Sequence, residues 1–319
     1  MGKKWIVGVD IGGTTIKIAF ISINGEILDK WEIPTNKNNH GNEIPGDIAK
    51  ALYTKLREHD LTTDHLLGVG VGAPGPINDR DGSVSVGINI GWNDFPLKKM
   101  LQEELSLPVA VDNDANVAAL GEMWKGAGEG ASDMLCITLG TGVGGGVIAN
   151  GDILHGVNGA AGEIGHMTVV TEDGAPCNCG KKGCLETVAS ATGIVRLANV
   201  WLGTIDTPSK LRNHQPLTSK VIFDCADEGD LVAKRLIEKV AFYLGLTLAN
   251  VANITNPQKI VMGGGVSKAG DTLLNPVKQQ FRQFAFPRVA EGAELTIAKL
   301  GNDAGVIGAA WLVKHKIEE

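Results

Sequence analysis

The feature that most constrains the fold is a pattern that the chain contains twice. In each copy an apolar strand leads into a Gly-Thr loop, a second apolar strand and an Asn-Gly turn; the copies begin at Ile6 and Met134. Apolar, β-branched segments separated by such turns are typical of antiparallel strands, and Asn24-Gly25 has the signature of a type I′ hairpin. We interpret the pattern as an internal duplication with one copy in each of two lobes; chance similarity of two hairpins is the alternative.

The rest of the chain has the pattern of an α/β protein. Apolar residues have helical spacing from Asp47 to Arg57, and buried strands that end in a turn or in acidic residues are predicted at 66–76 and 107–115. After Gly183 the chain is predicted to be mainly helical, with one more strand at 259–265 and an apolar C-terminal helix.

The expected division is a small lobe formed by residues 1–112 and 300–319 and a large lobe formed by residues 113–299, with a cleft between them. The net charge of −7 disfavours binding to nucleic acid or to an anionic membrane. The N-terminus lacks a secretory signal, and the longest uncharged stretch, 240–254, is shorter than a membrane-spanning helix and contains two asparagines. We therefore expect a cytoplasmic protein whose partners are small molecules.

Three glycine-rich loops are candidates for binding a nucleotide. In VDIGGTTIK, at 9–17, glycines after a strand let backbone amides approach an anion, although an ordinary tight hairpin explains this loop alone equally well and it does not match the Walker pattern. Two further loops end other strands, and all three could converge on one nucleotide. The candidate residues are Gly12, Gly13, Thr14, Gly140, Thr141, Gly142, Gly263, Gly264 and Gly265.

A candidate catalytic base follows the strand PVAVD. Asp114 would lie where a sugar hydroxyl could give up its proton during in-line attack on a phosphorus atom. Asp112 competes for this role, but we interpret Asp112 as a helix N-cap or turn former.

A candidate metal site lies in the segment 159–186. The spacing His166-x10-Cys177-x-Cys179-x4-Cys184 supplies a Cys3His set, which is the stoichiometry of a closed structural zinc site. A reduced, solvent-facing loop is the alternative, and a disulfide framework is not expected. A bound metal would order this loop and fix three polar residues suited to binding sugar hydroxyls: Glu163, His166 and Glu186. His166 could then bind the metal with one ring nitrogen and a sugar with the other. Asn89, beside Gly91 and Trp92, is a further sugar-binding candidate or a plain loop residue.

Together these motifs resemble the repressor, open reading frame and kinase (ROK) family, and the resemblance covers almost the whole chain. It implies a two-lobed, actin-like or hexokinase-type ATPase fold with duplicated RNase H-like domains. The matching segments are DIGGTTIK for the first phosphate loop, LGTGVGGG for the second, GAAGEIGH with CNCGKKGCLE for sugar and zinc, and VMGGGVS for the adenosine side. Many members carry a lysine where this chain has Thr15, so a direct phosphate role for Lys17 is not expected.

The resemblance also implies the chemistry. Asp114 would be the base, Mg-ATP would lie in the cleft with Asp10 near the Mg2+ ion, and zinc would be held by the Cys3His set. The sugar contacts implied are Asn89, Asn113, Asp114, Glu163, His166 and Glu186. Within the family the segment INIGW looks most like bacterial glucokinases, which implies transfer of the γ-phosphoryl of Mg-ATP to the 6-hydroxyl of glucose by a homodimer or homotetramer.

Three other functions compete. The first is a kinase for another hexose, such as fructose, N-acetylglucosamine, N-acetylmannosamine or allose, because one hydroxyl contact can decide the choice. The second is a sugar-responsive regulator, although the expected DNA-binding segment is missing and the net charge is negative. The third is an actin-like ATPase that only changes shape, against which the sugar motif argues.

Overall fold

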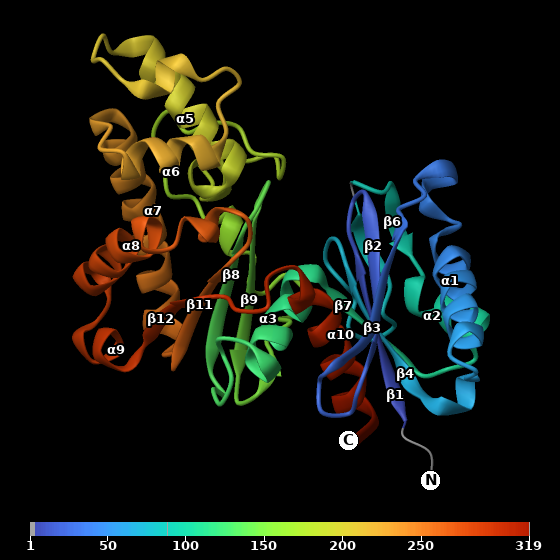
Figure 1. The fold of residues 1–319 in the computed structure, drawn as a ribbon. Coiled ribbons are helices and arrows are strands. Elements are labelled where there is room, and N and C mark those ends of the chain that lie inside the picture. The colour runs from blue at the N-terminus through green and yellow to red at the C-terminus, as the bar shows by residue number, and fades with distance from the viewer. Residues whose placement is uncertain (1–3, 88, 319) are drawn as a thin grey trace.

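The computed structural model describes residues 4–87 and 89–318, which form two lobes, each built on a five-stranded sheet (Figure 1). In the small lobe the strand order is β3-β2-β1-β4-β7. The first three strands are antiparallel, whereas β4 and β7 join β1 in parallel. The strand bounds are β1 Trp5–Ile11, β2 Thr15–Ile21, β3 Ile27–Pro34, β4 Leu66–Ala73 and β7 Val109–Asn113.

The large lobe repeats this topology. Its strand order is β10-β9-β8-β11-β12, again with three antiparallel strands followed by two parallel ones. The duplication predicted from the sequence is therefore confirmed by the sheet order and not only by the hairpins. The strand bounds are β8 Met134–Leu139, β9 Val143–Ala149, β10 Asp152–Ile153, β11 Lys259–Gly263 and β12 Glu294–Ile297.

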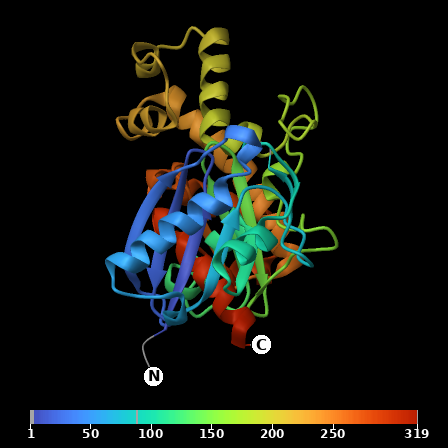
Figure 2. The ribbon, with the colours of Figure 1, turned by 90° about the vertical axis from the view of Figure 1, so that its right-hand side faces the viewer.

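Helices cover the sheets, and most of the large lobe after residue 186 is helical. In Figure 1, α1 and α2 cover the outer face of the small-lobe sheet, and Figure 2 shows α5 rising above the sheets. The bounds are α1 Ile44–Glu58, α2 Leu97–Leu105, α3 Asp114–Lys125, α4 Glu186–Ala189, α5 Ala191–Thr204, α6 Ser219–Asp227, α7 Leu231–Thr255, α8 Asp271–Phe284, α9 Pro287–Gly292 and α10 Ala304–Glu318. A short hairpin, β5 Val84–Gly87 and β6 Trp92–Phe95, extends the small lobe towards the cleft.

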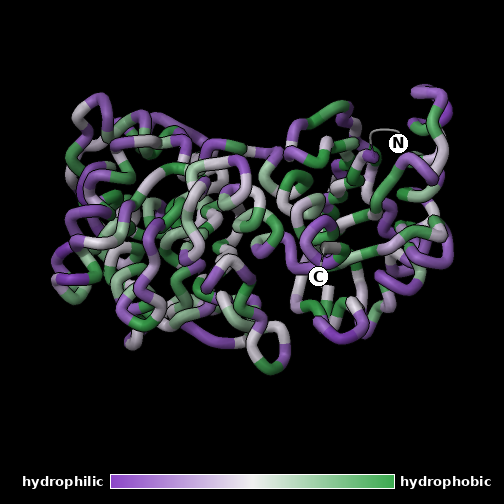
Figure 3. Tube along the Cα trace, turned by 90° about the horizontal axis from the view of Figure 1, so that it is seen from below, coloured by the Kyte–Doolittle hydropathy of each residue, from purple (hydrophilic) through white to green (hydrophobic). Residues whose placement is uncertain are grey.

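Each lobe has an apolar core of its own, and a third apolar cluster joins the two. Hydrophilic segments lie mainly at the outer edges of both lobes (Figure 3). The joining cluster includes Ile6 of the small-lobe sheet, Val261 of the large-lobe sheet, and side chains from α3 and α10. Burial of these apolar groups holds the two sheets together at a shared base.

The crossing of α3 and α10 depends on glycine because the backbones touch. A Cβ at Gly308 of α10 would lie 1.6 Å from the carbonyl oxygen of Val117 in α3, and a Cβ at Gly70 of β4 would lie 1.7 Å from the carbonyl oxygen of Ala309. No side chain fits at either position. These two glycines therefore let the C-terminal helix lie between the lobes.

The two Asn-Gly turns differ, and this corrects one expectation. Asn150 and Gly151 both have positive φ, 54° and 88°, as a type I′ turn requires. At the first turn only Gly25 has positive φ, 87°, and its amide donates to the carbonyl of Ser22. The Asn24-Gly25 hairpin is therefore a type I turn closed by a glycine bulge, not type I′.

The long uncharged stretch at 240–254 lies within α7, many of whose residues pack in the large-lobe core. Within residues 4–87 and 89–318, no helix is both long enough and apolar enough to cross a membrane.

Candidate functional site

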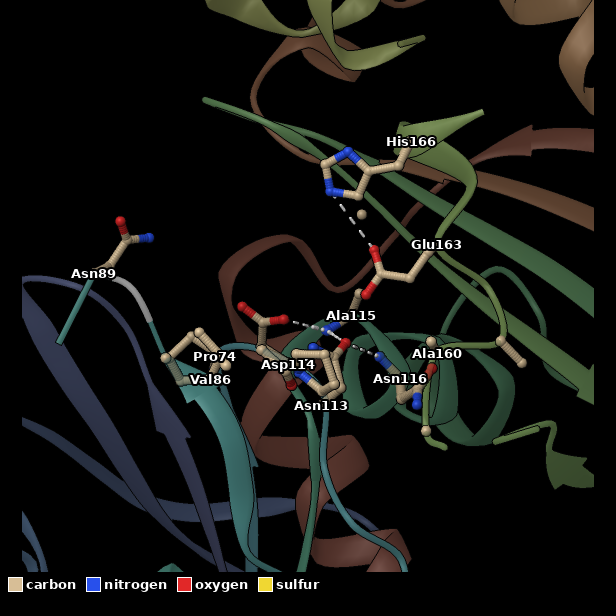
Figure 4. Close-up of a pocket in the computed structure, with 17 residues that line it drawn as sticks. Pro74, Val86, Asn89, Asn113, Asp114, Ala115, Asn116, Ala160, Glu163 and His166 are labelled. Atoms are coloured by element: carbon tan, nitrogen blue, oxygen red, sulfur yellow. Dashed lines mark hydrogen bonds and ion pairs between the residues drawn. The ribbon is translucent and has the colours of Figure 1, made fainter. Parts of the chain in front are cut away.

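A cavity of about 440 Å³ opens between the lobes and gathers most of the predicted sugar-binding residues (Figure 4). It is bounded on the small-lobe side by the β5–β6 hairpin and on the large-lobe side by the loop that precedes the metal motif. Five of the six predicted sugar contacts line it: Asn89, Asn113, Asp114, Glu163 and His166. Backbone atoms of several glycines complete the wall, which leaves room for a ligand rich in hydroxyl groups.

The N-terminus of α3 presents Asp114 to this cavity. Asn113 is the N-cap: its side-chain oxygen accepts hydrogen bonds from the amides of Ala115 and Asn116 at 2.9 and 3.3 Å. The amide of Asn113's side chain donates to the carbonyl of Gly75, and Asp114 accepts from the amide of Ala115 at 2.8 Å. Strand β7 thus ends in a capped turn that fixes the carboxylate at the cavity floor.

Of the two roles expected for Asp112, helix N-cap or turn former, the cap role is wrong, because Asn113 caps α3. Asp112 is 1% exposed and does not line the cavity, and its carboxylate contacts His155 and Asn116. Because Asp112 is buried and its carboxylate is already bound by three hydrogen-bond partners, it is not available to accept a proton from a sugar hydroxyl.

The environment of Asp114 suits proton acceptance. Asp114 is exposed at the cavity, but the many protein atoms around its carboxyl group still limit its hydration. Loss of hydration, followed by the negative charge of Asp10 and of Glu163, raises the pKa of Asp114 to about 6. At neutral pH the group is therefore ionised but more basic than an ordinary aspartate, as a general base requires.

Glu163 and His166 lie on the opposite wall, around the short 3-10 helix Ile164–His166. His166 Nε2 lies 3.9 Å from Glu163 Oε2, and Figure 4 shows both side chains facing the space above Asp114. Asn89 faces the same space from the small lobe. The three side chains offer hydrogen-bond donors and acceptors from both lobes to one ligand.

A second cavity, of about 420 Å³, adjoins the first and is lined by residues of two of the three glycine loops, whereas Gly12, Gly13 and Thr14 do not line it. Gly140, Gly142 and Gly264 line it, and Asp114 lines both cavities. Glu186, predicted to contact the sugar, lines this second cavity instead, and its carboxylate accepts a hydrogen bond from the amide of Val143 at 3.0 Å. Its role in sugar binding stays a prediction.

The first glycine loop lies at the turn between β1 and β2, where Gly12, Gly13 and Thr14 separate the strands. The carbonyl of Gly12 accepts from the Thr35 hydroxyl at 2.7 Å, which fixes the loop against the end of β3. Gly263, Gly264 and Gly265 end β11, and Thr141 lies at the β8–β9 turn; their predicted contacts with a nucleotide stay untested.

Asp10 and Lys17 line the second cavity from the small lobe. Lys17 Nζ lies 3.5 Å from Asp10 Oδ2 and 3.4 Å from the carbonyl of Asn302. Burial raises the pKa of Asp10, and the positive charge of Lys17 counteracts this. The sequence analysis did not place Lys17 at this cavity. The alternation of side chains along β1 and β2 could have done so, because it puts Lys17 on the same side of the sheet as its cross-strand partner Asp10.

The predicted metal ligands converge. His166, Cys177, Cys179 and Cys184 offer ligand atoms that all lie within 4.8 Å of one another. Cys179 Sγ lies 3.6 Å from Cys184 Sγ, and Cys177 Sγ lies 3.5 Å from His166 Nδ1. Bonds of about 2.3 Å to sulfur and 2.0 Å to nitrogen at tetrahedral angles give edges of roughly 3.5–3.8 Å, so the donors fit a zinc ion.

Two α/β lobes of the same topology, with glycine loops and a carboxylate in the cleft between them, define the actin-like ATPase fold. The sequence profile of the ROK family matches residues 6–316, and the chain belongs to this family. A curated relative from Halalkalibacterium halodurans, named glucokinase, is 61% identical over 99% of this chain and 97% of its own length.

Solved structures agree with this assignment. A ROK hexokinase from Thermus thermophilus aligns with a TM-score of 0.82 and 32% identity, over 98% of this chain and 99% of that one. A ROK family glucokinase from Streptomyces griseus, solved in complex with glucose and AMPPNP, aligns with a TM-score of 0.76 and 35% identity over the same shares of the two chains.

Proposed function

We propose that this protein is an ATP-dependent glucokinase that transfers the γ-phosphoryl group of ATP to the 6-hydroxyl of glucose. The observation that carries this is the position of Asp114, which lines both the cavity with the sugar-binding candidates and the cavity with the glycine loops. A hydroxyl activated there would face a phosphoryl donor in the adjoining cavity. The 61% identity to a glucokinase supports glucose as the acceptor.

In this mechanism Asp114 accepts the proton of the sugar hydroxyl as the oxygen attacks phosphorus. Its raised pKa, about 6, makes it a stronger base while leaving it ionised at pH 7. Asn113 has two tasks, since it caps α3 and lies in the cavity wall. Phosphoryl transfer needs mainly positioning and neutralisation of charge, so holding the carboxylate in place is the chain's main contribution.

Sugar recognition comes from both lobes in this proposal. Glu163 and His166 would bind hydroxyls from the large lobe, and Asn89 from the small lobe. Contacts from both sides favour closure of the cleft, which excludes water and suppresses hydrolysis of ATP.

The nucleotide would lie in the second cavity, with backbone amides of the glycine loops after β8 and β11 towards its phosphates. Asp10, at the same cavity, is suited to hold Mg2+, which would neutralise charge on the phosphates. Lys17 supplies a further cation beside Asp10.

We also propose that His166, Cys177, Cys179 and Cys184 hold a structural zinc ion. The distances between their donor atoms support this. Because Nδ1 of His166 faces Cys177, the other ring nitrogen would be left to face Glu163 and the sugar cavity. The metal would thereby fix the orientation of a sugar-binding side chain.

A coupled assay of ADP release tests the function. Purified protein is mixed with Mg-ATP and a panel of hexoses that includes glucose, fructose, N-acetylglucosamine, N-acetylmannosamine and allose, with a no-sugar control. We expect glucose to exceed the others clearly in kcat/KM. Preference for another hexose would keep the kinase and reject the substrate, whereas no release above the control would reject the kinase function.

A further inference from the structure

The carboxylate of Asp112 is buried at the end of β7 and is held by three donors. Its Oδ1 accepts from the amide of Asn113 at 2.7 Å and from the side chain of Asn116 at 2.8 Å, and its Oδ2 lies 2.7 Å from His155 Nε2. The side chain of Asp112 is 2% exposed. A buried charge needs such partners, and because a carboxylate only accepts hydrogen bonds, Nε2 of His155 carries the proton.

The donors connect Asp112 to the catalytic turn. Asn113 and Asn116, which bind Oδ1, are the N-cap and the third residue of α3. Asp114 lies between them and shares the amide of Ala115 with the Asn113 cap. A shift of the Asp112 carboxylate would therefore move the turn that presents the base.

His155 is also connected to the sugar-binding loop. Its carbonyl accepts from the amide of Ala161 at 3.0 Å, which closes the loop 155–161. Residues Gly159, Ala160 and Ala161 of this loop line the sugar cavity, and Glu163 follows two residues later. The backbone of His155 thus fixes one wall of the cavity while its side chain fixes the floor.

The contact crosses from one lobe to the other. Asp112 belongs to β7 of the small-lobe sheet, whereas His155 follows β10 at the edge of the large-lobe sheet. We propose that His155 is a positioning residue for phosphoryl transfer, which holds the Asn113-Asp114 turn in register with the sugar-binding loop through Asp112. This inference rests on the proposed kinase function and adds a residue to its machinery.

The charges around His155 support a cationic imidazole. The hydrogen bond with Asp112 raises the pKa of His155, burial opposes this, and the charge of Asp79 adds to the rise. Lys316 of α10 lowers it, and Lys316 itself lies 3.6 Å from Asp79. The buried carboxylate therefore favours the protonated form of the imidazole beside it.

Three variants test the proposal: His155→Ala, His155→Gln, which keeps a donor near Oδ2, and His315→Ala as the control. His315 contacts Asp152 of β10, the strand that precedes His155, at 3.0 Å, but it lines neither cavity of the site. We expect His155→Ala to lower kcat about tenfold or more with KM for ATP nearly unchanged, because misplacement of a base costs turnover. His155→Gln should recover most of the loss, and the control should stay near the wild type.

Hydrogen exchange supplies a measurement that does not depend on turnover. In His155→Ala, amides of both 113–116 and 156–163 should exchange faster, and in His155→Gln both should be protected again. Unchanged kcat and unchanged exchange in His155→Ala would overturn the proposal, as would a loss of kcat matched by a collapse of the melting temperature and not rescued by glutamine. The two proposals can also be separated. If the wild type phosphorylates no hexose but segments 113–116 and 156–163 still exchange faster together in His155→Ala, the kinase function is rejected, whereas the coupling of the two segments through His155 and Asp112 is supported.

Discussion

Asp114 combines an open face towards the cleft with an otherwise enclosed position, and its chemistry follows from this. We expect Asp114→Asn to lower kcat at least about 100-fold, because a positioned general base contributes a factor of this order. Glucose should still bind with a dissociation constant within a fewfold of the wild type, because the amide keeps the shape and can still hydrogen-bond a hydroxyl. Coupled turnover and calorimetric titration of glucose measure the two effects, and near-normal turnover would reject the assignment.

The thermal stability of the same variant is the control for folding. The pKa of Asp114 is raised from 3.8 to about 6, so the folded state prefers the protonated form. The stability that this group contributes is fully present below pH 3.8 and is lost as pH rises through 6. At pH 7 to 8 the uncharged asparagine should therefore melt no lower than the wild type, and a lower melting temperature would indicate lost structure and not lost chemistry.

The raised pKa also predicts the pH dependence of turnover. As pH falls through about 6, Asp114 becomes protonated and kcat/KM should fall. Glu163 raises this pKa through its negative charge. Glu163→Gln should therefore move the acid limb of the kcat/KM profile to lower pH, even if KM for glucose rises. A limb that stays in place would mean that another group controls it.

At the scale of elements, the candidate metal loop combines a buried ligand, Cys184, with more exposed ones. Cys179 is exposed, so Cys179→Ser removes a ligand without disturbing the core. We expect zinc content, measured by mass spectrometry, to fall well below one ion per chain, and KM for glucose to rise about tenfold or more through His166 while KM for ATP changes little. Cys225→Ala, which removes a buried thiol outside the cluster, should keep its zinc. Full zinc content in Cys179→Ser would reject this ligand.

The contact of α3 with α10 should be the most sensitive packing in the fold. Gly308→Ala would place a Cβ 1.6 Å from a backbone oxygen, and overpacking of this kind costs roughly 1–3 kcal/mol or more of unfolding free energy. Gly203→Ala is the matched control, because it also lies in a helix and, apart from its neighbours in that helix, no atom lies within 4 Å of its Cβ. Urea unfolding should show a loss for the first and a gain of about 0.5–1 kcal/mol for the second. Equal effects would contradict the close crossing.

The sequence predicted the elements that have a local signal. The apolar runs of β1, β4 and β7, the glycine loops and the spacing of the metal ligands each encode their structure within a few residues, and the structure confirms those strands and the convergence of the ligand atoms. Contacts between lobes have no such signal. His155 and Asp112 lie 43 residues apart in sequence, and Lys17 meets Asn302 from the other end of the chain, so neither contact could be predicted from spacing.

Local patterns also misled where two residues compete for one role. Asp112 and Asn113 are both good cap residues, and only the register of β7 decides that Asn113 caps and Asp112 turns inward. The Asn24-Gly25 turn looked the same as Asn150-Gly151, but the register shift near Ile21 lengthens the first loop. The predicted division into residues 1–112 with 300–319 and 113–299 stays a prediction, because α3 and α10 pack at the base shared by both lobes.

At the scale of the whole molecule, the two lobes are joined at the base by α3, α10 and the His155–Asp112 contact, while the sugar cavity above has walls from both. A ligand that bonds to both walls binds the closed form better than the open form, so it must shift the population towards closure. Glucose should therefore lower the radius of gyration measured by X-ray scattering. Asn89→Ala removes a small-lobe contact that the packed base does not use. This variant should bind glucose more weakly and, at saturating glucose, close less than the wild type, while its scattering without sugar stays the same. Equal compaction in the two proteins would show that closure is driven from the large-lobe wall alone.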